Sequence, residues 1–283
     1  MIKVLKAGFY TTVQDMGRIG FASFGVPVSG VMDSYSANIA NSILDNSIDS
    51  ALLEITFGGT KIQFLADTFI AISGADFSPV LNQQKIKHNT RIKINSGDVL
   101  SFGKLNFGVR SYLAVKGGIQ TPKVLNSRSQ YQSITKNFRL QKGDILKIVP
   151  CVDDTKSTNA TVKLNLPYFT STDVECFEGP EFYLLSLQQK KQLLKTMFRV
   201  SSENSRMGYH LKETIRNNFP SILTSGVVPG TVQLTPSGKL IVLMRDCQVT
   251  GGYPRILQLT EKAINKMAQK TLNAQFKFRL INA

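Results

Sequence analysis

The sequence has few of the residues that hold metals or disulfides. Its two histidines are His88 and His210, and its three cysteines, Cys151, Cys176 and Cys247, form no CxxC pair. So few histidines argue against a zinc site, and an odd number of scattered cysteines fits reduced thiols better than a disulfide framework. We therefore expect no metal site.

Long apolar runs are also missing. No stretch reaches eighteen consecutive apolar residues, which excludes a membrane-spanning helix by the usual length criterion. The first residues, MIKVLKAGFYTTV, resemble a strand rather than a signal peptide, because Lys3, Lys6 and Gly8 interrupt the apolar positions. We expect a cytoplasmic protein that does not contact a membrane.

The common catalytic and nucleotide-binding motifs are absent. The sequence contains no G-x-x-x-x-G-K-[ST], G-x-G-x-x-G, G-x-S-x-G or H-E-x-x-H. The usual phosphate loop, dinucleotide fold, hydrolase elbow and metalloprotease helix therefore have no support. Any chemistry must rest on less familiar groups of residues.

The chain carries a formal net charge of +15, and the excess is unevenly distributed. Residues 1–100 hold 8 Lys and Arg against 8 Asp and Glu, whereas residues 101–283 hold 26 against 11. A basic face for a phosphate-bearing partner is one interpretation. A solvated lysine-rich surface is the simpler one, because no nucleic-acid-binding motif or Arg-rich run accompanies the charge. We expect no nucleic-acid partner.

Short β-forming runs separated by Gly, Asn and Asp turns dominate the chain. Such spacing is typical of a barrel or a sandwich. Three helices are predicted among the strands: one beginning at the N-cap Asp33, one over 184–197 and one over 260–269. Residues 151–172 are polar and poorly patterned up to Leu164, which favours a connection between two domains, 1–160 and 161–283.

The segment TTVQDMGRIGFASFGVPVSGVMD, residues 11–33, concentrates glycines and hydrogen-bonding side chains. Asp15, Arg18, Ser29 and Asp33 lie among four glycines, which allow positive φ and close approach to the backbone. This pattern indicates a shaped polar loop, and a solvent-exposed turn cluster is the alternative.

Three more polar groups stand out later in the chain. Arg110 lies in a predicted strand whose other residues are mostly apolar and therefore expected to be buried. At such a position an arginine binds a carboxylate or phosphate ligand or pairs with an internal acid such as Glu54. Residues 202–209, SENSRMGY, are either a ligand-binding turn or a capping turn. Residues 243–255, LMRDCQVTGGYPR, follow an apolar strand, and two glycines there expose backbone N–H groups to an anionic or amide ligand; a simple hairpin bend is the alternative.

Together these segments carry a family resemblance. The motifs are TTVQDMGRIG with GVPVSGVMD, ALLEITFGG, FGVRSYLAVKGGI with VLNSRS, SENSRMGYHL, and GVVPGTVQLTPSGKLIVLMRDCQVTGGYPRI. In this order, and over nearly the whole chain, they resemble the KipA-like biotin-dependent carboxyltransferase family, which includes the C subunit of 5-oxoprolinase. The resemblance implies a mainly β fold of two cyclophilin-like β-barrel subdomains with a few short helices.

The resemblance also implies a function. It points to a subunit of an ATP-dependent 5-oxoprolinase complex, a hydrolase that opens the lactam of 5-oxo-L-proline to L-glutamate and acts only within the complex. The implied partners are subunits A and B, which are KipI-like and LamB/YcsF-like proteins, and a small-molecule amide substrate. The implied cofactor is ATP with Mg²⁺ in the complex, with no biotin on this chain.

Candidate site residues follow from the chemistry that the resemblance implies. Positive groups are expected around a carboxylate and a phosphoryl group, acids are expected to position Mg²⁺ or transfer protons, and polar side chains are expected to bind the amide edge. The catalytic candidates are Asp15, Asp33 and Arg206. The substrate-binding candidates are Arg18, Ser29, Arg110, Arg128, Asn204, Gln248, Thr250 and Tyr253.

Two other functions remain open. The same unit forms half of the carboxyltransferase part of urea carboxylase, so the chain could be a carboxyltransferase half of a biotin-dependent urea or amide carboxylase. It carries no Met-Lys-Met biotin acceptor, so the carrier would be a separate chain. The other function is a non-enzymatic, KipA-like antikinase regulator that binds a partner protein.

The chain departs from the family pattern at three places. Leu-Gly-Asn is common in the family where this chain has Asp45 in the middle position, and a threonine is common where it has Val249 and Gln130. Val249 matters most, because a methyl group replaces a hydroxyl beside the expected amide-binding residues.

Overall fold

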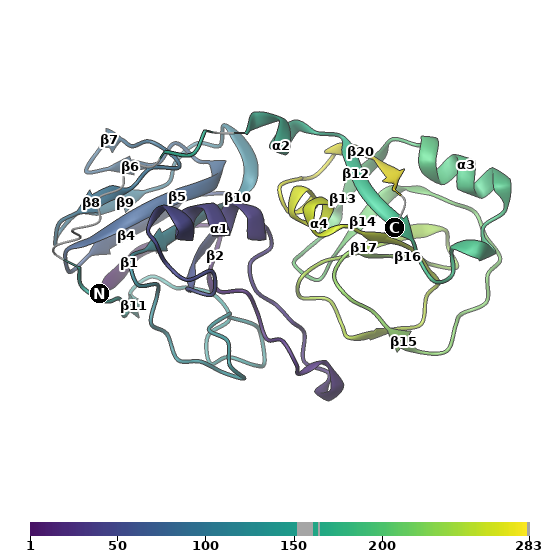
Figure 1. Cartoon of the computed structure of the whole chain (residues 1–283), viewed down its shortest axis with the longest axis horizontal. Helices are drawn as coiled ribbons and strands as arrows, with labels where there is room; N and C mark the ends of the chain where they lie inside the picture. Colours follow the sequence, from purple (N-terminus) through teal and green to yellow (C-terminus); the bar gives the residue numbers. More distant parts are fainter. Residues whose placement is uncertain (152–160, 164, 282–283) are drawn as a thin grey trace. The chain divides into compact units, whose positions relative to one another are not determined.

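The chain divides into two compact units. The computed structural model describes residues 1–151, 161–163 and 165–281 (Figure 1). Unit 1 comprises Met1–Arg18 and Ser29–Asn165, and unit 2 comprises Ile19–Val28 and Leu166–Ala283. The boundary expected at residue 160 lies outside the described residues.

Unit 1 contains two sheets. The first has the order β11-β1-β4-β9-β6-β7, with β11 Ile145–Leu146, β1 Ile2–Ala7, β4 Thr60–Phe64, β9 Val99–Ser101, β6 Val80–Leu81 and β7 Gln84–Lys85. The second has the order β2-β3-β10-β5-β8, with β2 Tyr10–Gln14, β3 Leu52–Thr56, β10 Phe107–Val115, β5 Thr68–Asp76 and β8 Ile92–Ile94. Neighbouring strands are antiparallel throughout both sheets.

The core of unit 1 lies between these two sheets. Alternate residues of the second sheet, such as Leu53, Ile72 and Leu113, form one cluster with Ile62 and Phe64 of the first sheet, and all are fully buried. Burial of this apolar surface is the main force that holds the two sheets together.

Helix α1, Ser34–Ile43, covers the opposite face of the second sheet and contacts β5 and β10. It begins where the sequence predicts, because the Asp33 carboxylate accepts a hydrogen bond from Ser36 N at 3.1 Å. Asp33 thus satisfies one of the backbone N–H groups that a helix start leaves unpaired.

Unit 2 contains a closed barrel of seven strands. Their order is β12-β19-β16-β17-β14-β13-β20, with β12 Asp173–Glu178, β19 Arg255–Leu259, β16 Thr231–Leu234, β17 Lys239–Leu243, β14 Gly208–Thr214, β13 Phe198–Asn204 and β20 Gln275–Leu280. β12 and β20 close it as a parallel pair. A small separate sheet pairs β15, Ser225–Gly226, with β18, Thr250–Gly251.

Aromatic and branched side chains fill the barrel. Phe198, Phe276 and Phe278 pack with their ring centroids 5.3–6.3 Å apart. The remaining elements of unit 2 are η1 Ala22–Phe24, α2 Leu166–Thr170, η2 Phe182–Leu184, α3 Leu187–Lys195 and α4 Glu261–Ala268. α3 contacts β20, and α4 contacts β12 and β19.

The predicted mainly β fold with few short helices is confirmed. The three predicted helices correspond to α1, which begins directly after Asp33, and to α3 and α4, which lie inside the predicted ranges. In the part of the chain that the structure describes, no helix has both the length and the apolar character needed to cross a membrane.

Candidate functional site

The carboxylate of Asp15 is the centre of a polar cluster in unit 1. Its Oδ1 accepts hydrogen bonds from Gly17 N at 2.9 Å and from the hydroxyls of Ser127 and Ser129 at 2.6 Å each. Its Oδ2 accepts one from Arg128 N at 2.5 Å. Asp15 is 7% exposed, so one buried carboxylate joins the loop after β2 to a loop more than a hundred residues later.

Neighbouring residues strengthen the same connection. The Arg18 guanidinium, which is fully buried, donates to the carbonyl of Ser129. Gln130 Oε1 accepts from Val13 N at 3.0 Å, so the glutamine that departs from the family pattern has a structural role here. The Arg128 side chain donates to Gln120 Oε1 at 2.8 Å.

Gly30 and Ser29 complete this loop. Gly30 has φ +85°, and a Cβ there would lie 2.9 Å from Gly17 N, so this close backbone approach requires glycine. Ser29 is 1% exposed and also has positive φ, +56°. The segment predicted to be a shaped polar loop is therefore packed into unit 1 at both ends.

Arg110 and Asp33 belong to a second polar cluster in unit 1, around the buried Glu54. The Glu54 carboxylate accepts from Met32 N at 2.7 Å and from the Tyr112 hydroxyl at 2.9 Å, and Arg110 Nε lies 3.7 Å away. The Tyr112 oxygen in turn accepts from Asp33 N at 2.8 Å, and burial raises the pKa of this phenol well above its usual value. The alternative in which Arg110 pairs with Glu54 is the one observed.

These two clusters do not offer a metal site. Both oxygens of Asp15 and both oxygens of Asp33 already accept from N–H or O–H donors. Mg²⁺ binds carboxylate oxygens in a nearly octahedral arrangement, and Asp15, which accepts four hydrogen bonds, could do so only by losing some of these donors. Among residues 1–151, 161–163 and 165–281, no three His, Cys, Asp or Glu side chains are grouped so that they could hold a metal ion.

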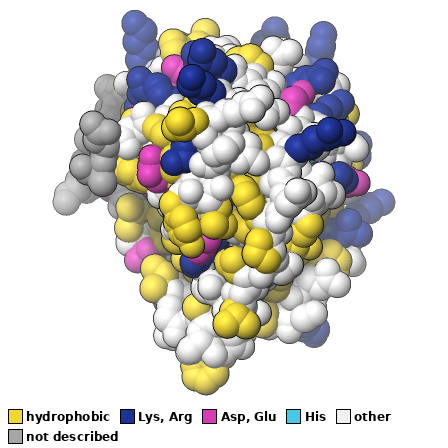
Figure 2. All heavy atoms as spheres, turned by 90° about the vertical axis from the view of Figure 1, so that its right-hand side faces the viewer, with side chains coloured by type: hydrophobic (Ala, Val, Ile, Leu, Met, Phe, Trp, Pro, Cys, Tyr) yellow, Lys and Arg dark blue, Asp and Glu magenta, His cyan; other side chains and the backbone are white. Residues whose placement is uncertain are grey.

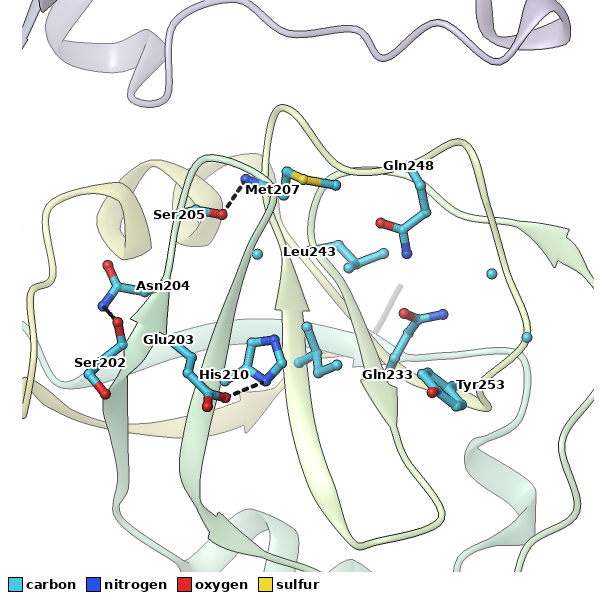
Figure 3. Close-up of a pocket in the computed structure, with 14 residues that line it drawn as sticks. Ser202, Glu203, Asn204, Ser205, Met207, His210, Gln233, Leu243, Gln248 and Tyr253 are labelled. Atoms are coloured by element: carbon cyan, nitrogen blue, oxygen red, sulfur yellow. Dashed lines mark hydrogen bonds and ion pairs between the residues drawn. The ribbon is translucent and has the colours of Figure 1, made fainter. Parts of the chain in front are cut away.

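Unit 2 contains a cavity of about 530 Å³ (Figure 3). Its walls come from the end of β13, the start of β14, strands β16 and β17, and the loop that contains β18. It is lined by residues 202–205, Met207, Gly208, His210, Gln233, Ile241, Leu243, Gln248 and residues 251–253.

The strand register explains how this cavity forms. Ile241 of β17 is paired with His210 of β14 on one side and with Gln233 of β16 on the other, so these three side chains share one face of the barrel wall. Val232 and Leu234, the neighbours of Gln233 in β16, are fully buried and occupy the opposite face. The cavity therefore lies on the outer face of the barrel, with the His210–Ile241–Gln233 row as its floor.

Three of the predicted substrate-binding residues line this cavity. They are Asn204, Gln248 and Tyr253, which the sequence places in two segments about 45 residues apart. Asn204 Nδ2 donates to Ser201 O at 2.7 Å within the last residues of β13, where the register with β14 shifts. Thr250 does not line the cavity; it is exposed in β18.

Arg206 lies between two lining residues, Ser205 and Met207, but does not itself line the cavity. Its Nε and Nη2 donate to the two carboxylate oxygens of Asp246 at 2.7 and 3.0 Å. Its backbone carbonyl also accepts from Asp246 N at 2.9 Å. Arg206 thus joins the two loops that border the cavity.

Gln233, His210 and Glu203 line the cavity but are missing from the sequence-based candidates. His210 Nδ1 lies 3.5 Å from Glu203 Oε2. The sequence could have identified Gln233, because a glutamine between Val232 and Leu234 in an alternating strand must face away from the barrel core. The alternation does not show that this outer face is covered by a loop.

The lining of the cavity is poor in positive charge. Within the part of the chain that the structure describes, no Lys or Arg lines it, and Glu203 is its one acidic residue. Figure 2 shows that, on the face at the unit 2 end, Lys and Arg side chains gather toward the top and the right-hand edge of the view. The positive charge on this face does not extend into the described lining of the cavity.

Comparison with known proteins shows which family the chain resembles in sequence and structure. The family described as carboxyltransferase domain, subdomain A and B, matches residues 24–280. The chain is 33% identical to the C subunit of 5-oxoprolinase from Escherichia coli over 284 residues, which cover 98% of this chain and 90% of that protein.

Relatives of a second kind are much longer than this chain. It is 47% identical to the urea amidolyase of Lachancea kluyveri over 147 residues, which are 52% of this chain and 8% of that protein. The crystal structure of the K. lactis urea amidolyase is similar to it with a TM-score of 0.87 and 28% identity, covering 99% of this chain and 19% of that one.

Proposed function

Because this chain belongs to the carboxyltransferase domain, subdomain A and B, family, we propose that it is a subunit of an ATP-dependent complex that opens 5-oxo-L-proline to L-glutamate. The length of the similarity to the C subunit of 5-oxoprolinase supports this proposal. That relative matches 98% of this chain and is itself covered over 90% of its length.

The lining of the unit 2 cavity fits an amide substrate. Amide carbonyls are poor electrophiles, so a site that opens a lactam must hold the ring while the carbonyl is activated and water attacks. Gln248 and Tyr253 would bind the amide edge, and Asn204 would shape the wall opposite them. Arg206 would act as a positioning residue, because its ion pair with Asp246 connects the two loops that carry these side chains.

ATP and Mg²⁺ do not fit the described residues of this chain. The acids proposed to position Mg²⁺, Asp15 and Asp33, have both oxygens engaged, and the cavity lining lacks the Lys or Arg that a triphosphate needs. We therefore assign ATP binding to the partner subunits, A and B, and derive no step in which this chain holds the nucleotide.

Reconstitution of the complex tests the proposed function. The purified chain is mixed with the subunits A and B from the same cell, ATP, Mg²⁺ and 5-oxo-L-proline, and released glutamate is measured. Glutamate should appear only when all three proteins and ATP are present. Release at the same rate without this chain, or no release from the full mixture, would contradict the proposal.

A second candidate function is supported by the 47% identity to a urea amidolyase over about half of the chain. In that case the chain would be half of a carboxyltransferase that transfers a carboxyl group from biotin on a separate carrier to urea or another amide. The reconstituted activity would then require bicarbonate and be blocked by avidin. Lactam opening that is insensitive to avidin would exclude this candidate.

A further inference from the structure

Gln233 is an unusual residue at the floor of the unit 2 cavity. It is 1% exposed, yet among the described residues its side-chain Nε2 finds no hydrogen-bond acceptor. A buried donor without a partner is destabilising, and most native proteins avoid it. An apolar residue would fill the position more favourably if it served the fold alone, and an acceptor from outside the chain would satisfy this amide.

Gly251 provides the space that this amide occupies. A Cβ at residue 251 would lie 2.5 Å from Gln233 Nε2, which is closer than a van der Waals contact allows. The next nearest group, Val227 Cγ1, is at an ordinary distance of 3.4 Å. Any side chain at residue 251 would therefore displace the end of Gln233 and leave the backbone in place.

The surroundings of Gln233 define the class of ligand. In Figure 3 the amides of Gln233 and Gln248 extend toward each other across the cavity, and Leu243 lies beside them. The described lining has no Lys or Arg to pair with a phosphate or another dianion, and its one carboxylate, Glu203, already lies 3.8 Å from Lys239 Nζ. The uncharged lactam ring of the proposed substrate fits such a lining, whereas its carboxylate finds no Lys or Arg among the described lining residues.

We infer that Gln233 recognises the carbonyl oxygen of a lactam by donating from Nε2, and that the absence of a side chain at Gly251 leaves room for this donor. The inference rests on the proposed function for the identity of the substrate, and it makes Gln233 a specificity-determining residue of that site. A lactam is locked in the cis form, so its N–H and C=O lie on one edge. Gln248 Oε1 accepts the N–H while Gln233 donates to the carbonyl, and the ring carbons pack against Leu243 and Ile241.

The test uses the full-length chain and 2-pyrrolidinone, a lactam without a carboxylate. The side-chain NH₂ signal of Gln233 is identified in ¹H–¹⁵N NMR spectra by its loss in Gln233→Met, and it should shift as 2-pyrrolidinone is added. Gly251→Ala should weaken binding about tenfold, as expected for one lost hydrogen bond. Gly226→Ala is the matched control, because a Cβ there meets nothing within 4 Å, and it should bind like the wild type.

Related compounds test whether the ligand must present an amide N–H and C=O on one edge and whether it must be uncharged. N-methyl-2-pyrrolidinone, which lacks the N–H, should bind more weakly than 2-pyrrolidinone, and inorganic phosphate should not compete. Urea presents the same cis edge without ring carbons and should also bind more weakly. Tighter binding of urea, or displacement of the lactam by phosphate, would overturn the assignment to a lactam.

The unfolding temperature and the lactam affinity of the variants distinguish an effect on folding from an effect on binding. Gln233→Met should unfold at the same temperature as the wild type or higher, since it removes a buried unpaired donor. Wild-type lactam affinity in both Gln233→Met and Gly251→Ala would overturn the inference, even if the reconstituted complex releases glutamate. Loss of lactam binding in both variants would support it, even if the complex releases none, in which case the proposed function alone would fail.

Discussion

Arg206 and Asp246 form a buried, bidentate ion pair on the border of the unit 2 cavity, with Nε–Oδ2 and Nη2–Oδ1 distances of 2.7 and 3.0 Å. Both side chains are 8% exposed. The pair joins the turn after β13 to the loop after β17, and these two segments supply much of the cavity wall. Its geometry therefore makes Arg206 a support for the site.

Arg206→Ala should destabilise the protein by about 3–5 kcal/mol, because it leaves the Asp246 carboxylate buried without its partner. Urea unfolding of the full chain measures this loss, and Asp246→Ala should show a similar one. Arg279→Met is the control, since Arg279 forms an exposed pair with Glu175 and its loss should cost less than about 1 kcal/mol. Wild-type stability of Arg206→Ala together with loss of glutamate release would instead show that Arg206 acts in the reaction.

Asp15→Asn should weaken the connection between the loop after β2 and residues 127–129. An asparagine replaces one acceptor oxygen with an NH₂ group, which then faces a backbone N–H or hydroxyls that donated to Asp15. We expect a loss of about 2 kcal/mol in urea unfolding and faster hydrogen exchange at the amides of Gly17 and Arg128. Asp49→Asn, on an exposed turn, should change neither. Unchanged exchange at both amides would contradict the structural role of Asp15.

Local patterns in the sequence predicted the fold better than the site. The Asp33 N-cap, the three longer helices and the strand-rich class follow from interactions within a few residues. The bond between Asp15 and Ser129 spans 114 residues, and no local pattern specifies it. Similarly, the alternation in β16 shows that Gln233 faces outward, but it does not show that the loop with Gly251 and the end of β13 form a cavity above it. Arg110 and Arg206 were predicted to bind substrate or to act in catalysis because they are charged, but in the structure they pair with the internal acids Glu54 and Asp246.

The two buried cysteines should resist thiol reagents in the folded protein. Burial raises the pKa of Cys176 and of Cys247 to about 12, so almost no thiolate is present at neutral pH, whereas Cys151 is partly exposed. Ellman's reagent at pH 8 should therefore label one thiol rapidly in the native chain and three in denaturant. Cys151→Ser should abolish the rapid phase. A second rapidly labelled thiol in the native wild type would contradict this assignment.

Lys270 should make the stability of the protein depend on pH in the alkaline range. It is 6% exposed, its Nζ donates to Ser171 O at 2.7 Å, and burial together with the nearby Lys266 lowers its pKa from 10.5 to about 8. Between these two values the unfolded chain binds the proton and the folded chain does not, so the contribution of Lys270 to stability rises with pH, by at most about 1.4 kcal/mol per pH unit. Urea unfolding at pH 7, 8.5 and 10 should show the stability of the wild type rising relative to that of Lys270→Met. Lys262→Met, at an exposed position of α4, should show no such trend relative to the wild type. A wild-type to Lys270→Met difference that stays constant over this range would mean that Lys270 keeps its proton in the folded state.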